Sequence, residues 1–101
     1  MKNEIIQRLK ALIAFMQNEK NYYAMFRNVL ESCAVAIELN QICFSEQFIS
    51  DSEFVGTSRI INSCRQKAIE IHRDWIIKRL ESSKTEHTKK SIIMSVYNDI
   101  F

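Results

Sequence analysis

Arg65 and His72 are the two side chains in this sequence whose types and spacing best suit catalysis. They are seven positions apart in a segment with a helical pattern, so they lie on one side of a helix, two turns from each other. An arginine can hold a phosphate while a histidine moves a proton, which is the combination that cleavage of RNA requires. The pair is therefore a candidate RNA site. The competing interpretation is a surface Arg65 and a partly buried His72.

The spacing of Arg65 and His72 resembles the Arg-x4–6-His signature of HEPN ribonuclease domains, which are also small helical bundles. The resemblance implies a ribonuclease in which these two residues form the active site. It covers these two residues alone. Gln66 follows the arginine, where the family more often has a small polar or acidic residue, and this departure weakens the resemblance.

Other catalytic arrangements are not apparent in the sequence. Glu70 and Asp74 lie one turn apart, and they are spaced to pair with Arg73 and Lys78 on a helix surface. A metal site would require a histidine at matching spacing, and the sequence has none there. With one glycine in the chain, a nucleophile elbow and a Gly-rich phosphate loop are both excluded by motif. We expect no metal, no cofactor and no enzymatic activity, apart from the ribonuclease alternative.

The three cysteines are Cys33, Cys43 and Cys64, and none belongs to a Cys-x-x-Cys pair. An odd number cannot pair completely within one chain, so we expect free and mostly buried thiols in a reducing compartment. The first residues carry Glu4, Arg8 and Lys10, which interrupt any signal-peptide pattern. No stretch approaches the ~18 apolar residues of a membrane span. The sequence therefore predicts a cytoplasmic protein that does not enter a membrane.

The elements expected to position these residues are helices. Proline is absent and glycine occurs once, which disfavours hairpin turns, so we predict an all-α fold over residues 1–101 as a single helical domain. The expected architecture is a compact bundle of four main helices plus one or two short helical turns. Apolar periodicity predicts the following main helices: Asn3–Asn18, Asn21–Leu39, Ser58–Ser82, and a last helix that begins at Thr85 or Thr88 and carries Ile92, Ile93, Val96, Tyr97 and Ile100.

The boundaries follow from local signals. Asn40 is the expected left-handed stop of the second helix, and residues 41–56 are expected to contain the short turns. Thr57 or Ser58, after Gly56, is the expected cap of the third and longest helix. The apolar stripe of that helix comprises Ile61, Cys64, Ala68, Ile71 and Trp75. Trp75, the only tryptophan, is predicted to anchor the core, and the helical spacing of Tyr22, Tyr23 and Phe26 also favours core positions over base stacking.

Charge is distributed unevenly along the chain. From Asn28 to Ser58 there are five acidic residues and no Lys or Arg, whereas the rest of the chain from Arg59 holds nine basic residues against five acidic ones. Phenylalanines alternate with the acids, and such a mixture suits a protein interface because aromatic rings supply burial while charges steer the encounter. The other interpretation is a solvated face with no partner. The predicted partner-binding residues, all expected at the surface, are Glu38, Phe44, Glu46, Phe48, Asp51, Glu53 and Phe54.

These observations favour a small protein-binding module. Its most concrete form is an immunity or antitoxin protein that covers the basic active site of a nuclease toxin with its acidic surface. The first alternative is an RNA-directed protein, either a HEPN-like ribonuclease or a nucleic-acid-binding regulator that uses the basic central helix. The second alternative is a self-associating helical protein whose apolar stripe completes a dimer core.

Overall fold

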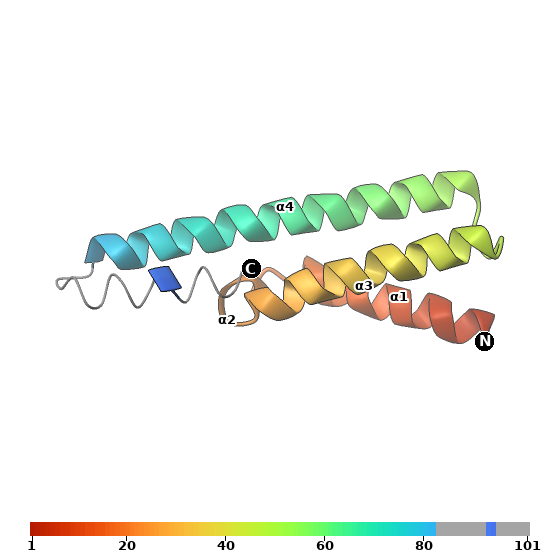
Figure 1. Ribbon diagram of the computed structural model, residues 1–101, viewed down its shortest axis with the longest axis horizontal. Helices are drawn as coiled ribbons and strands as arrows, with labels where there is room; N and C mark the ends of the chain where they lie inside the picture. Colours follow the sequence, from red (N-terminus) through yellow and green to blue (C-terminus); the bar gives the residue numbers. More distant parts are fainter. Residues whose placement is uncertain (83–92, 95–101) are drawn as a thin grey trace.

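The computed structural model describes residues 1–82 and 93–94, and this part of the chain forms an all-α bundle (Figure 1). Its helices are α1 (Lys2–Gln17), α2 (Asn21–Ala24), α3 (Phe26–Ser45) and α4 (Asp51–Ser82). The predicted all-α bundle is confirmed. The predicted last helix, from Thr85 or Thr88 onward, lies outside the described residues except for Ile93 and Met94, which are helical and exposed.

The bundle is a rod of 55 × 20 × 19 Å, and α3 is its central helix. α3 packs against α1 on one side and α4 on the other, and it runs antiparallel to both (Figure 1). Its buried residues fall at steps of three and four: Phe26, Val29, Cys33, Ala36, Asn40 and Cys43. All three cysteines are buried and free, so the prediction of buried thiols is confirmed.

The second predicted helix is divided and extended in the structure. Met25 leaves the helical conformation, which separates α2 from α3. α3 then continues past Asn40 to Ser45, so the predicted stop at Asn40 is wrong. Asn40 is buried between two helices, and its side-chain amide joins them. Its Nδ2 donates to the Phe54 carbonyl (3.2 Å) and to Ser58 Oγ (3.1 Å), both on α4.

The C-terminal end of α3 is closed by two backbone hydrogen bonds around Gln47. Phe48 N–H donates to the Cys43 carbonyl at 2.8 Å, and Gln47 N–H donates to the Phe44 carbonyl at 3.1 Å. This pattern is a Schellman motif, and it requires the left-handed conformation at Gln47, whose φ is 60°. A glycine would suit this position better, because a side chain at positive φ is strained.

α4 begins at Asp51, seven residues before the predicted start at Ser58. The signal that determines this start is a capping box. Ser50 Oγ accepts a hydrogen bond from Glu53 N–H (3.2 Å), and Glu53 Oε1 accepts one from Ser50 N–H (2.9 Å). Gly56 therefore lies inside the helix, and residues 46–50 alone connect α3 to α4. The short helical turns expected in residues 41–56 are replaced by the ends of two long helices.

The buried face of α4 also differs from the predicted stripe. The buried positions are Ile61, Cys64, Ala68, His72 and Ile76. Beyond Ala68 the buried face advances in steps of four through His72 and Ile76, whereas Ile71 and Trp75 are only partly buried. Trp75 is only partly buried and lies outside the core cluster, so the prediction that it anchors the core is wrong. The spacing argument was correct for Tyr22 and Phe26, which are buried, and wrong for Tyr23, which is exposed.

The left-handed turn provides a test of the Schellman motif. Gln47→Gly should raise the free energy of unfolding by about 0.5–1 kcal/mol, because it removes a side chain from positive φ. Gln41→Gly, at an exposed helical position of α3, should instead lower it by roughly 1 kcal/mol. Urea unfolding of both variants measures this difference. Destabilisation by both substitutions would contradict the assigned turn.

The capping box makes stability depend on pH in the acid range. Hydrogen bonds from Ser50 lower the pKa of Glu53 below its ordinary value. Its contribution is therefore complete above the unfolded-state pKa, about 4.3, and is lost as the pH falls through the folded-state pKa. Glu53→Gln keeps a neutral hydrogen-bond acceptor for Ser50 N–H but removes the carboxyl group that titrates. The stability difference between the wild type and this variant should be larger at pH 7 than at pH 3. An equal difference at the two pH values would contradict the assigned cap.

Candidate functional site

Six of the seven predicted partner-binding residues lie close to the α3–α4 connection, at one end of the rod (Figure 1). We call this group the acidic end: Phe44, Glu46, Phe48, Asp51, Glu53 and Phe54. The end of α3, the connecting residues and the first turn of α4 bring them together. Glu38 is the exception, because it lies on α3 about two turns before the end of that helix.

Two phenylalanines form the apolar part of the acidic end. The rings of Phe44 and Phe54 pack against each other across the connection with centroids 4.5 Å apart, and both side chains remain partly exposed. Phe48 is turned further inward and packs against the core. Glu46 and Asp51 are exposed, and they lie two positions after Phe44 and three positions before Phe54 in the sequence. The arrangement offers aromatic surface bordered by carboxylates.

Two features of the acidic end were not foreseen. Glu53 is exposed, but it caps α4, so it has a structural role and is not simply a surface acid. Lys2 of α1 lies at the same end, with its ammonium 5.8 Å from the centroid of the Phe48 ring. The separation of charge along the sequence therefore overstates the separation in space, because one base from the N-terminus borders the acids.

Arg65 and His72 do not form a shared surface in this chain. Arg65 is exposed, whereas His72 is 3% exposed and its ring stacks on Phe26 with centroids 4.0 Å apart. His72 Nδ1 lies 3.2 Å from the Tyr22 carbonyl oxygen. Because a carbonyl can only accept, Nδ1 carries the proton in this contact. The geometry makes His72 a packing residue between α4 and the α2–α3 junction.

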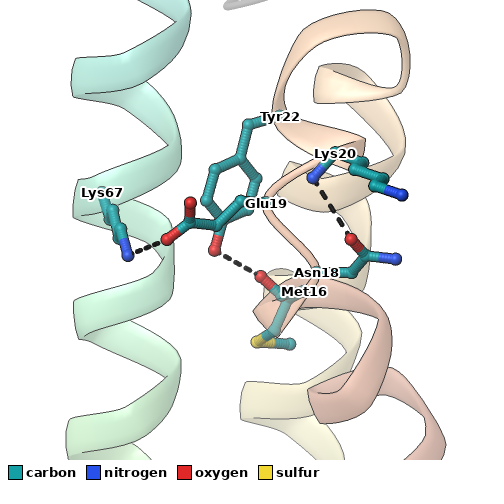
Figure 2. A network of polar contacts seen from close by, with 6 residues as sticks. All are labelled: Met16, Asn18, Glu19, Lys20, Tyr22 and Lys67. Carbon is teal, nitrogen blue, oxygen red and sulfur yellow. Dashed lines mark hydrogen bonds and ion pairs between the residues drawn. The ribbon is translucent and has the colours of Figure 1, made fainter.

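A second group of contacts joins the α1–α2 turn to α4 (Figure 2). The Tyr22 hydroxyl donates to the Met16 carbonyl at 2.6 Å, and Lys67 forms an ion pair with Glu19. Burial raises the pKa of Tyr22 to about 12, so its hydroxyl remains a donor at neutral pH. The first contact joins α2 to the end of α1, and the second joins the α1–α2 turn to α4, so together they fix the position of α2 and its Tyr23.

The opposite end of the rod contains a group that the sequence did not reveal. We call it the aromatic end: Tyr23, Asp74, Trp75, Lys78 and Arg79. The Tyr23 and Trp75 rings meet edge to face, with centroids 6.1 Å apart, and the Arg79 guanidinium lies 4.9 Å from the centroid of a Trp75 ring. Tyr23 and Trp75 are distant in sequence, so finding this group requires knowing that α2 packs against α4.

A groove of about 460 Å³ lies between α1 and α3. Apolar side chains of both helices, among them Leu12, Phe15 and Val35, line it together with Arg8 and Glu31. Within residues 1–82 and 93–94 no three His, Cys, Asp or Glu side chains are grouped to hold a metal ion. In the same part of the chain, no helix has both the length and the apolar character that crossing a membrane requires.

The two residues of the candidate RNA site should behave differently when they are removed. His72→Ala should lower the free energy of unfolding by about 2 kcal/mol or more, because it removes the stack on Phe26 and the donor to the Tyr22 carbonyl. Arg65→Ala should change it by less than about 0.5 kcal/mol. Thermal unfolding followed by circular dichroism measures both. Equal and small effects would mean that His72 is accessible and unpacked, contrary to the structure.

Comparisons with known proteins give no family to which the chain can be assigned. No protein-family model matches it, and neither a curated protein nor a solved structure matches it. The resemblance to HEPN ribonucleases therefore rests on the spacing of Arg65 and His72 alone. The function has to be inferred from the chemistry of the two ends of the rod and of the groove along it.

Proposed function

We propose that the chain is a protein-binding module that binds a basic protein partner through the acidic end. The supporting observation is the partly exposed Phe44–Phe54 pair with the exposed Glu46 and Asp51 near it in the sequence. Exposed aromatic rings gain most from burial in an interface, and adjacent carboxylates steer and select a partner of opposite charge. The acids lie on short, capped backbone segments, so they are presented in a defined geometry.

The most specific form of this proposal is an immunity or antitoxin protein. A nuclease needs a basic active site to hold phosphates, and an acidic, aromatic surface is complementary to such a site. The immunity form is supported by this complementarity together with the small size of the chain. The partner would lose access to nucleic acid while bound.

The proposed interface is tested with a charge-reversed variant and a matched control. Glu46→Lys with Asp51→Lys alters the acidic end but leaves the Ser50–Glu53 cap in place. Glu70→Lys with Glu81→Lys makes the same change in net charge on α4, away from the acidic end. The wild type and both variants are immobilised, and lysate of the native host is passed over each of them.

The expected result is a basic protein that the wild type and the control retain and the acidic-end variant does not. With that protein purified, its association rate should fall at least tenfold for the acidic-end variant at low salt. The loss should shrink at high salt, because exposed charges are screened over about 10 Å at 0.1 M. Equal retention by all three proteins, or retention of RNA alone, would overturn the proposal. If the partner is a nuclease, the wild-type chain should inhibit its activity.

A further inference from the structure

The aromatic end contains a cavity that the proposed protein interface does not use. It encloses about 230 Å³ and is lined by Tyr23, Ile71, Asp74, Trp75 and Lys78. It lies at the C-terminal end of α4, where that helix packs on α2, and the acidic end is at the other end of the rod (Figure 1). Any ligand of this cavity would therefore bind independently of a protein at the acidic end.

The position of the cavity follows from the lengths of the helices. α4 has 32 residues and spans about 48 Å, whereas α3 has 20 residues and spans about 30 Å. α4 thus extends beyond the start of α3, and the part of α4 around residues 72–75 meets the short α2. Tyr23 of α2 and Trp75 of α4 then form two walls at an angle of 83°, and Ile71 adds apolar surface.

The polar groups around these walls are of two kinds. Lys78 lines the cavity, and the Arg79 guanidinium lies over Trp75 just outside it, so two cations flank the aromatic surface. Asp74 also lines the cavity, and its exposed carboxylate lies 3.7 Å from Arg73 Nε. An aromatic wall stacks a base, a cation holds a phosphate, and a carboxylate accepts a hydrogen bond from an exocyclic amino group, as on cytosine.

We infer that the aromatic end binds single-stranded nucleic acid by stacking one amino-bearing base in the cavity against the exposed Tyr23 ring, beside Trp75. Lys78 and Arg79 contact the phosphates on either side of that base. A strand is favoured over a free nucleotide because consecutive residues on a helix project about 100° apart, so Lys78 and Arg79 are directed toward different phosphates. Asp74 gives the site a preference for cytosine over thymine, because thymine has no amino group to donate.

The test uses the intrinsic fluorescence of the full-length chain. Trp75 is its single tryptophan, so quenching reports on this site directly. The probes are a twelve-nucleotide oligodeoxycytidine, the matching oligothymidine, and cytidine monophosphate at the same nucleotide concentration. We expect the oligodeoxycytidine to quench the Trp75 fluorescence most. Relative to it, the oligothymidine should bind at least threefold more weakly and the mononucleotide at least tenfold more weakly.

Variants separate binding at the site from general attraction to charge. Tyr23→Ala should weaken binding of the oligodeoxycytidine at least tenfold. Asp74→Asn should remove the preference of the site for oligodeoxycytidine over oligothymidine. Lys78→Gln should reduce the slope of log K against log salt by about 0.7, the value of one phosphate contact on a single strand. Arg59→Gln, an exposed base near the other end of α4, is the matched control and should leave affinity within twofold.

Three outcomes would overturn the inference. The first is an absence of quenching by either oligonucleotide at 50 mM salt. The second is equal quenching by the mononucleotide, which would make the cavity a nucleotide site and not a strand site. The third is equal weakening by Arg59→Gln and Lys78→Gln, which would show attraction to charge without a defined site. Binding at the acidic end is measured separately, so either proposal can fail while the other holds.

Discussion

The structure depends on the burial of α3 between α1 and α4. Apart from Phe26 at its start, its inward positions are small or of moderate size, and Val29, Ala36 and Cys43 have no exposed surface. Such side chains allow the two neighbouring helices to pack closely along the whole of α3. One polar side chain, Asn40, lies in this contact and joins α3 to the first turns of α4 by two hydrogen bonds. The relative position of the long helices therefore follows from α3.

The two ends of the rod acquire different chemistry from this arrangement. At one end, a Schellman motif and a capping box reverse the chain within residues 46–50, and they set the acids and phenylalanines of the acidic end on ordered backbone. At the other end, α4 extends beyond α3 and is covered by α2, which leaves Trp75 at an edge beside Tyr23. The acidic end thus depends on two helix caps, whereas the aromatic end depends on the unequal lengths of α3 and α4.

The parts of the fold that sequence reasoning predicted are those that depend on local periodicity. The spacing of Leu9 and Met16, or of Ile61, Cys64 and Ala68, was sufficient to identify helices and their inward faces. The errors arose where tertiary contacts decided the outcome. Asn40 looked like a helix stop because its side chain often ends helices, yet here its amide has partners on α4 that the sequence does not reveal. Gly56 looked like a boundary, but the capping box at Ser50 and Glu53 provides a better start.

The candidate sites show the same limit. Residues 44–54 are close in sequence, so their grouping in space could be predicted. The role of Glu53 as a cap could have been read from the Ser-x-x-Glu pattern. The burial of His72 agrees with the competing interpretation of the Arg65–His72 pair, but its partners could not be predicted, because they depend on where Phe26 and the Tyr22 carbonyl lie relative to α4. The aromatic end was missed for the same reason, since Tyr23 and Trp75 are distant in sequence and meet only through the turn of α2.

The central claim is that the acidic end is the surface that contacts a protein partner. Hydrogen–deuterium exchange of the full chain, alone and with its purified basic partner, tests this claim most directly. The account predicts slower exchange in residues 44–54, with little change in the α1–α3 groove and at the aromatic end. Protection confined to the groove or to the aromatic end, with none in residues 44–54, would contradict it.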